Sequence, residues 1–305
     1  MDVARDLGYQ RGPRRRPGEH GGAQGIVDVV VSHIEGSWIG RVLEGVERET
    51  AATGTDLVLT VARFDDGWVQ RVLRRPTLGV ITVLVDTSVS ELHALMAAGL
   101  PVIVIDPGSR PPKGVASIGA TNWDGGRLAA EHLLSLGHRE IAIVGGSPSH
   151  LFSSARIDGF TTALRGRGVD VRPERLVYGE WNRGQAGDVF GRLLDGSDGR
   201  PTAVFACSDT MALGVYDAAA ERGVRIPEDL SVVGFDDVQE ATWASPPLTT
   251  VQQPISEMGA AAFRMLGRLR QAGDSDGAES AVRIELETGL VERLSTRPRD
   301  DEPRE

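Results

Sequence analysis

Two carboxylates stand side by side directly after an apolar stretch of the sequence. Asp236 and Asp237 follow LSVVGF at 230–235, a short run with adjacent valines that is typical of a strand buried on both faces of a parallel sheet. Ligands of open α/β sheets bind in the crevice beyond the carboxyl ends of the strands. The position therefore favours a ligand site, and a solvated turn is the alternative on these residues alone.

Two tryptophans follow strands in a similar way, in a chain with only 5% aromatic residues. Trp38 comes shortly after the predicted strand 26–31, and Trp181 comes shortly after the predicted strand 176–178. We expect both to lie near the ligand-binding edge, with core packing as the alternative for each. Trp68, Trp123 and Trp243 are expected to be packing or surface residues.

Short apolar strands alternate with amphipathic helices along most of the chain. The expected strands of the first half are 26–31, 57–61, 80–85, 102–105 and 116–119, and after a helix over 124–136 the series restarts with strands 141–144, 176–178, 203–206 and 230–235. This alternation predicts right-handed β-α-β units. The fold class is therefore α/β, with two doubly wound parallel-sheet units in tandem.

The end of the chain adds a few elements to this plan. A helix is predicted over 255–271, a turn over 273–277 and one late strand over 282–290. The polar tail over 297–305 is expected to be disordered. Ser208 or Asp209 opens the helix expected over 209–222, and Asp209 is favoured as its cap.

The composition limits the classes of protein to be considered. The 305 residues have a net charge of −10, which argues against a body that tracks a nucleic-acid backbone. Residues 1–24 are a basic arm, or an ordinary frayed terminus. The single cysteine, Cys207, is expected to be buried. No run is long and apolar enough for a membrane span and no signal peptide is recognised, which predicts a cytoplasmic protein.

Three long stretches resemble one protein family. They are GHREIAIVGGSPSHLFSSARIDGF at 137–160, PTAVFACSDTMALGVYDAAAERGVRIPEDLSVVGFDD at 201–237 and PPLTTVQQPISEMG at 246–259. In order and spacing they resemble the ligand-binding core of the lactose-repressor family, LacI/GalR, and a weaker likeness extends over 26–119. The resemblance implies a periplasmic-binding-protein-like fold of two similar subdomains, joined by three crossovers, with an effector in the cleft between them.

The resemblance also implies a division of the chain and a function. The N-subdomain would comprise 25–121 plus 254–279, and the C-subdomain 122–253 plus 280–296. In the family such cores pair as dimers, and a bound sugar or nucleobase changes how an N-terminal helix-turn-helix head holds its operator DNA. We therefore expect a homodimeric transcriptional repressor that responds to a small effector.

The start of the chain departs from the family pattern. MDVARDLGYQRGPRRR at 1–16 resembles only the end of the family's head, so the recognition helix is missing, and Pro13, Pro17 and Gly18 replace the hinge helix. Either the sequence begins inside a longer gene product, or the protein has lost its head. Operator DNA would be bound through a head that is largely absent from this chain.

The resemblance assigns effector contacts residue by residue. GSWI at 36–39 stands at the family's first helix, which implies that Ser37 and Trp38 line the cleft from the N-subdomain. Trp181, in GEW, stands where an aromatic side chain stacks on the ligand from the other side. Arg156, in the pattern Arg-x-x-Gly-Phe, matches the family arginine that reaches into the cleft, and Asp236 matches the aspartate that accepts from ligand hydroxyls.

Two more positions follow from the same resemblance. Asp124, in TNWDGG, matches a polar position at the crossover that contacts sugar in some members, and a plain helix cap is its alternative. Ser208 stands where many members have asparagine, so its contact with the effector would be shorter.

These side chains suit a carbohydrate effector. Sugar recognition combines an aromatic ring against a C–H face with charged or amide groups that bridge neighbouring hydroxyls. The planar fork of Arg156 fits two vicinal hydroxyls, and Asp236 can hold Arg156 when the cleft is empty. We expect a neutral carbohydrate, with a pentose or xylo-oligosaccharide as first guess, rather than a purine or an anion. The sugar would shift the population towards a closed cleft.

Two other classes share parts of this pattern. A periplasmic-type sugar-binding protein for transport has the same fold and cleft, but it needs a signal peptide or lipobox, and neither is recognised. A nicotinamide-dependent sugar dehydrogenase is disfavoured because the first strand runs into SHIEGSW without G-x-G-x-x-G. The six histidines are scattered without ligand spacing. We therefore expect no metal, no cofactor and no enzymatic activity.

Overall fold

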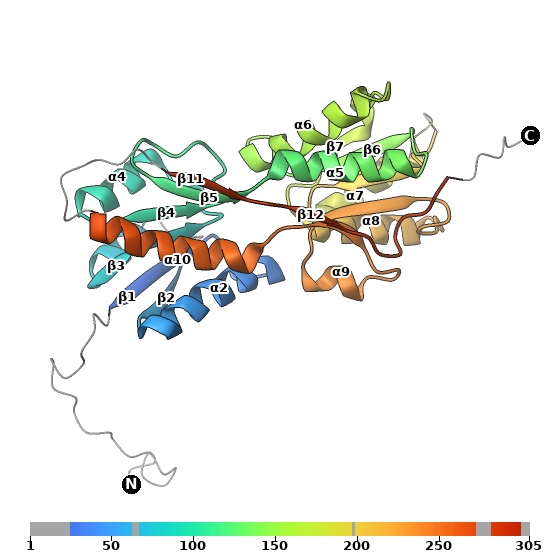
Figure 1. The fold of residues 1–305 in the computed structure, drawn as a ribbon. Helices are drawn as coiled ribbons and strands as arrows, with labels where there is room; N and C mark the ends of the chain where they lie inside the picture. Colours follow the sequence, from blue (N-terminus) through green and yellow to red (C-terminus); the bar gives the residue numbers. More distant parts are fainter. Residues whose placement is uncertain (1–24, 63–66, 197–198, 273–281, 300–305) are drawn as a thin grey trace, which may run out of the picture.

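Two similar α/β units lie side by side in the computed structural model (Figure 1). It describes residues 25–62, 67–196, 199–272 and 282–299, so the predicted arm over 1–24 and the turn over 273–277 lie outside the described residues. Each unit is built on a six-stranded sheet, with strand orders β11-β5-β4-β3-β1-β2 and β12-β10-β9-β8-β6-β7. The doubly wound α/β architecture predicted from the sequence is confirmed.

The first unit is a β-α-β series that runs from residue 25 to residue 120. Its elements are β1 Ile26–Val31, α2 Ser37–Thr53, β2 Asp56–Val61, α3 Trp68–Leu73, β3 Thr77–Val83, α4 Val89–Ala97, β4 Val102–Ile105 and β5 Ala116–Ala120. The strands pair in parallel. Apolar side chains on their two faces form two clusters, one beneath α2 and the other beneath α3 and α4.

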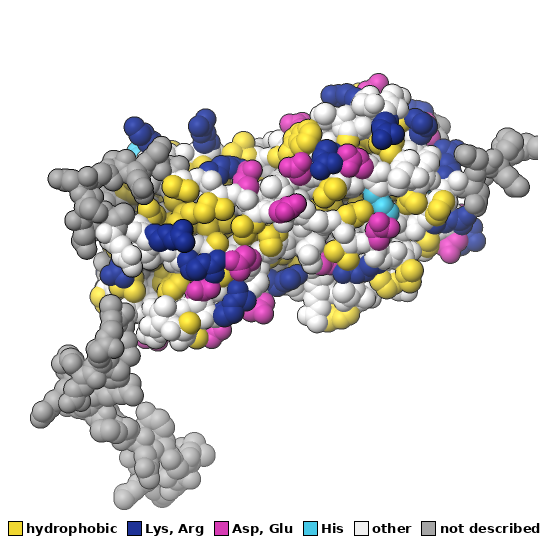
Figure 2. Space-filling model, in the orientation of Figure 1, with side chains coloured by type: hydrophobic (Ala, Val, Ile, Leu, Met, Phe, Trp, Pro, Cys, Tyr) yellow, Lys and Arg dark blue, Asp and Glu magenta, His cyan; other side chains and the backbone are white. Residues whose placement is uncertain are grey.

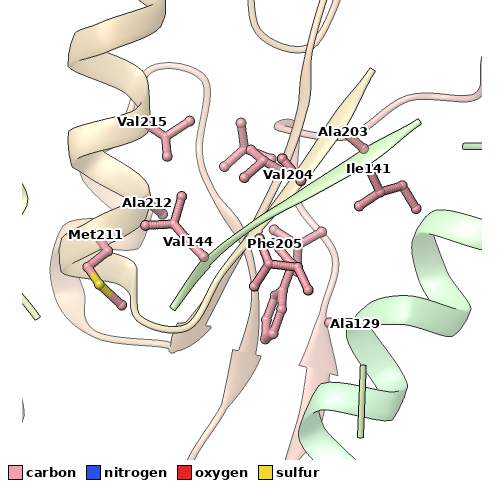
Figure 3. Close-up of a cluster of buried hydrophobic side chains, with 14 of the residues drawn as sticks. Ala129, Ile141, Val144, Ala203, Val204, Phe205, Met211, Ala212 and Val215 are labelled. Carbon is pink, nitrogen blue, oxygen red and sulfur yellow. The ribbon is translucent and has the colours of Figure 1, made fainter. Parts of the chain in front are cut away.

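The second unit repeats the plan over residues 122–252. Its elements are α5 Asn122–Ser135, β6 Ile141–Gly145, α6 Leu151–Arg165, the short 3-10 helix Pro173–Arg175, β7 Leu176–Tyr178, α7 Arg183–Asp195, β8 Ala203–Ala206, α8 Asp209–Glu221, β9 Ser231–Asp236, α9 Gln239–Trp243 and β10 Thr249–Gln252. Helices cover both faces of the sheet. Figure 3 shows this core, with Val204 of β8 towards Val215 of α8 and Phe205 towards Ala129 of α5.

The chain passes between the units three times. The passages lie between β5 and α5, between β10 and α10 (Ile255–Ala272), and between β11 (Arg283–Leu286) and β12 (Gly289–Val291). Thr288, at the third passage, donates its hydroxyl to the carbonyl of Thr121 at 3.2 Å and its backbone N–H to the Thr121 hydroxyl at 3.0 Å. Two of the passages are therefore bonded to each other.

The end of the chain differs from the sequence prediction. The single strand expected over 282–290 is wrong, because β11 pairs in parallel with β5 of the first sheet while β12 pairs antiparallel with β10 of the second. The assignment of 280–296 to the second subdomain is therefore wrong for β11. The tail over 297–305 was expected to be disordered, but its first residues are ordered up to Arg299, whose N–H donates to the carbonyl of Leu136 at 2.8 Å.

The cap of α8 is Ser208 and not Asp209. The Ser208 hydroxyl accepts from the Met211 N–H at 3.2 Å, which satisfies one of the free donors of the first turn. Asp209 is buried and points away from its own helix, because its oxygens accept from the Thr250 hydroxyl and the Val238 N–H at 2.5 and 2.9 Å. Asp209 therefore joins β10 and the loop after β9 to α8.

Candidate functional site

The carboxyl ends of strands in the two sheets carry unusual backbone conformations. Six described residues other than glycine have positive φ, and all six lie at or just after the carboxyl end of a strand: Leu84, Asp106, Glu180, Trp181, Asp236 and Asp237. Residues other than glycine rarely adopt a positive φ, because this backbone conformation is strained. Strained residues of this kind are common at functional sites. The edge that holds these residues is therefore the first candidate for a ligand site.

Arg156 lies at the centre of this edge. It belongs to α6 and is only 3% exposed, which is unusual for an arginine. Its Nη1 donates to the carbonyl of Cys207 at 2.6 Å, and its Nε donates to Oδ1 of Asn122 at 2.7 Å. The same Nη1 is 3.5 Å from Oδ1 of Asp236, and the guanidinium lies 3.8 Å from the ring centre of Phe235. The guanidinium is therefore held in one place.

Two buried carboxyl groups interact with this guanidinium, and a third, Asp209, interacts with one of them. Burial raises the pKa of Asp236 to about 7 although Arg156 opposes the shift, and Gln253 donates to its Oδ1 at 2.6 Å. Burial likewise raises the pKa of Asp106, in the loop after β4, to about 6 against the effect of Arg156. Burial and the charge of Asp236 raise the pKa of Asp209. The site is therefore rich in oxygen acceptors and poor in compensating positive charge.

Trp181 forms an aromatic wall beside Arg156. Its indole Nε1 donates to Nδ1 of His150 at 3.0 Å, and its ring centre lies 5.0 Å from that of Phe152. The guanidinium of Arg156 is 5.6 Å from the indole ring. A Cβ at Gly146 would come within 2.0 Å of the indole, so this position, just after β6, has to be glycine for Trp181 to fit.

A small cavity lies next to this cluster, between the two units. Its walls include Asp106 and Glu285 from the first unit and Asn122, Trp123 and Phe152 from the second. Its volume of about 110 Å³ is below that of the ~150 Å³ cavity known to bind benzene. A sugar ring would therefore enter only if the units or the lining side chains move.

The predicted site residues lie in different surroundings. The structure brings Arg156, Asp236 and Trp181 together. Asp124 lines the mouth of the cavity, with its side chain 53% exposed and its Oδ1 3.4 Å from Arg127. Ser208 is buried, and its hydroxyl caps α8.

Ser37 and Trp38 lie on another part of the boundary between the units. The Ser37 hydroxyl donates to Oε1 of Glu240 in α9 at 2.6 Å, across that boundary. Ser37 also lines a second, open hollow together with Arg41 and Arg293. Trp38 is half-buried and packs against the apolar core of the first unit.

Sequence reasoning missed several residues of the cluster. Asp106 directly follows the apolar strand Val102–Ile105, the same signal that pointed to Asp236, so it could have been found. Trp123 was expected to be a packing or surface residue, yet it lines the cavity. Asn122 and Gln253 carry no such signal, because their roles depend on Arg156 and Asp236, which are distant in the sequence.

Metal and membrane sites receive no support from the described residues. Among them, no group of three or more His, Cys, Asp or Glu side chains is arranged to hold a metal ion. Over the same residues, no helix has both the length and the apolar composition needed to cross a bilayer.

The chain matches one family model and many regulators. Residues 130–296 match the family described as periplasmic binding protein-like domain. The transcriptional repressor PurR of Pasteurella multocida is 29% identical over 279 residues, which are 90% of this chain and 81% of that protein.

Solved structures of regulators share the fold. The transcriptional regulator CelR in complex with cellobiose is 29% identical, with a TM-score of 0.80, and the match covers 96% of this chain and 88% of that one. A LacI family regulator of Enterococcus faecium with bound ribose is 27% identical, also with a TM-score of 0.80, covering 90% and 100%. The family model spans more than half of the chain. The protein therefore belongs to the lactose-repressor, or LacI/GalR, family of transcriptional regulators.

Proposed function

We propose that this repressor binds a small neutral carbohydrate between its two units, and that the bound sugar changes the affinity of the repressor for operator DNA. The observation that supports the proposal is the meeting of Arg156 of α6 with Asp236 and Trp181 at the carboxyl edge of the second sheet. The regulators with bound cellobiose and ribose share the fold, which favours a sugar over other effectors.

The chemistry of the cluster fits a sugar ring. Trp181 and Phe152 offer aromatic faces for the C–H groups of the ring, and Arg156 offers paired donors for neighbouring hydroxyls. Asp236 and Asp106 accept from hydroxyl groups. Because the charge of Arg156 already acts on Asp106 and Asp236, the cluster favours a neutral effector over an anion.

Regulation would act through the relative position of the units. Leu151 of the second unit donates its N–H to the carbonyl of Gly108 in the first unit at 2.8 Å. Arg41 of the first unit donates to the carbonyl of Asp237 in the second unit at 2.7 Å, so hydrogen bonds connect the two units at two places. A sugar that fits the closed arrangement better than the open one would shift the population by its difference in affinity.

The DNA would be held by a head and not by the described core. On the face shown in Figure 2, acidic and basic side chains are interspersed over both units, and no broad basic surface crosses it. The net charge of −10 agrees with this view. As in the rest of the family, we expect a homodimer that works in the cytoplasm, where the operator is.

Calorimetric titration with pentoses, hexoses and their disaccharides tests the proposal. We expect at least one saccharide to bind, and Trp181→Ala or Asp236→Ala to abolish binding and sugar-induced closure without unfolding the protein. X-ray scattering measures the closure. Gel-shift experiments test the link to DNA, with and without that saccharide, and use the core joined to a helix-turn-helix head together with the operator of that head. Failure of every saccharide to bind, or unchanged affinity in both variants, would count against the proposal.

A further inference from the structure

Trp123 lies at the mouth of the cavity between the units. It is the second residue of α5 and lines the cavity, yet 42% of its surface is exposed. Its backbone is closely packed, because a Cβ at Gly159 of α6 would come within 1.9 Å of the Trp123 carbonyl oxygen. A large aromatic side chain on a fixed backbone, half open to water, offers a surface that a ligand can cover.

Phe152 links the cavity to the inner cluster of Arg156, Asp236 and Trp181. Phe152 lines the cavity and also contacts Trp181, with 5.0 Å between the ring centres. Arg156 and Asp236 are only 3% and 7% exposed, whereas Trp123 is 42% exposed. A single ring bound by the buried groups would therefore leave Trp123 uncovered, and a longer ligand would reach both.

Polar groups at the mouth match the hydroxyls of a second ring. Asp124 and Glu285 line the cavity with side chains that are 53% and 43% exposed. Each is paired with an arginine, Asp124 with Arg127 at 3.4 Å and Glu285 with Arg283 at 2.5 Å. Exposed pairs of this kind contribute little to stability, so their oxygens and N–H groups are available to bond hydroxyls of a ring stacked on Trp123.

We propose that the effector contains at least two sugar rings, with the inner ring held at Arg156 and Asp236 and the outer ring stacked on Trp123. This inference rests on the proposed function and adds to it the size of the effector and the residue that selects it. A free monosaccharide would fill only the inner part of the site.

Matched pairs of sugars test the outer ring. The full chain is titrated calorimetrically with xylose against xylobiose and with glucose against cellobiose. In the pair that binds, we expect the disaccharide to bind at least about tenfold more tightly, because it covers additional apolar surface. Trp123→Ala should lower the disaccharide's affinity to that of the monosaccharide and leave the monosaccharide unchanged, while Trp123→Phe keeps part of the gain. Trp181→Ala should weaken both.

Trp243→Ala is the matched control. Trp243 is 68% exposed on α9 and is not among the residues that line the cavity, so its loss should change neither affinity. Circular dichroism and thermal melting show whether each variant is folded. Equal binding of both sugars by the unmodified protein, or an unchanged disaccharide affinity in folded Trp123→Ala, overturns the outer ring but not the proposed function. Absence of binding by every saccharide overturns both.

Discussion

Arg156 interacts with more buried carboxyl groups than it can neutralise. Its charge opposes the shifts of both Asp106 and Asp236, yet burial still raises the pKa values of these groups to about 6 and about 7. At neutral pH the folded protein therefore holds protons that the unfolded chain has released. The ionised form of Asp236 costs stability in the absence of ligand, and a sugar that donates hydrogen bonds to the carboxylate would recover part of that cost.

The Asp236→Asn variant should show this cost as a change in pH dependence. A carboxyl group with a raised pKa lowers the free energy of unfolding as pH rises from its unfolded value of 3.8 through its folded value of about 7. Asparagine cannot ionise, so the stability of the variant relative to the unmodified protein should increase between pH 5 and pH 8, on the order of 2 kcal/mol.

Urea unfolding at several pH values measures this difference. His132 and His138, whose pKa values are lowered by burial, act in the opposite direction, but they are present in both proteins and cancel. A difference in stability that stays constant from pH 5 to pH 8 would show that Asp236 is ionised throughout.

The site residues that can be predicted from the sequence follow local patterns, and those that cannot depend on partners distant in the sequence. Asp236 and Trp181 follow apolar strands, so their place at the strand ends is predictable from local sequence. Asn122 becomes part of the site only because it meets Arg156, 34 residues away, and this depends on how α5 packs on α6. The Ser208 hydroxyl caps α8, whereas the sequence favoured Asp209, because the buried partners of Asp209 on β10 and after β9 are distant in the sequence.

Glycines set how closely the helices of each unit approach. In the first unit, a Cβ at Gly259 of α10 would come within 2.2 Å of the carbonyl oxygen of Val42 in α2. In the second unit, a Cβ at Gly126 of α5 would come within 2.0 Å of the carbonyl oxygen of Arg156 in α6. The close contact between α5 and α6 places Asn122 and Arg156 within bonding distance, so the helix pair that shapes the site depends on glycine.

Some helices and strands were not predicted because they are too short, or because the chain changes sheet within them. α3 and α9 have only six and five residues, too few to show a helical period. The alternation over 282–290 is continuous, but the chain leaves one sheet and joins the other within it. A break of this kind is set by the separation of the two sheets and not by the residues of the segment.

Two glycines of α10 make a matched pair of substitutions. Gly267→Ala adds a methyl group that meets no described atom within 4 Å apart from the backbone of its own helix and its chain neighbours, so it should raise the free energy of unfolding by about 0.5–1 kcal/mol through helix propensity. Gly259→Ala forces α10 away from α2 and should lower it by about 1–3 kcal/mol. Denaturant unfolding compares the two in one experiment. Equal effects of both substitutions would mean that α2 and α10 are not in close contact in solution.

At the scale of the molecule, the two units contact each other beyond the three passages. Val238, after β9 of the second sheet, packs against the apolar core of the first unit. Ser37 and Arg41, in α2 of the first unit, donate to Oε1 of Glu240 and to the carbonyl of Asp237. These polar contacts are few, and each stabilises the observed arrangement of the units by on the order of 1 kcal/mol. The binding free energy of a ligand can therefore exceed their sum. The boundary is therefore suited to two arrangements.

Removing one of these contacts should shift the molecule towards an open arrangement. Glu240→Ala deletes the acceptor of the Ser37 hydroxyl, and a change on the order of 1 kcal/mol corresponds to roughly a fivefold shift in the ratio of open to closed molecules. We expect a larger radius of gyration by X-ray scattering and, because the sugar favours the closed arrangement, a loss of sugar affinity of at most about fivefold by calorimetry. Thr242→Ala is the control on the same helix, since the Thr242 hydroxyl donates to the carbonyl of Gln239 in its own turn and to no described residue of the first unit. If Glu240→Ala scatters and binds like this control, the Ser37 contact does not help to hold the units together.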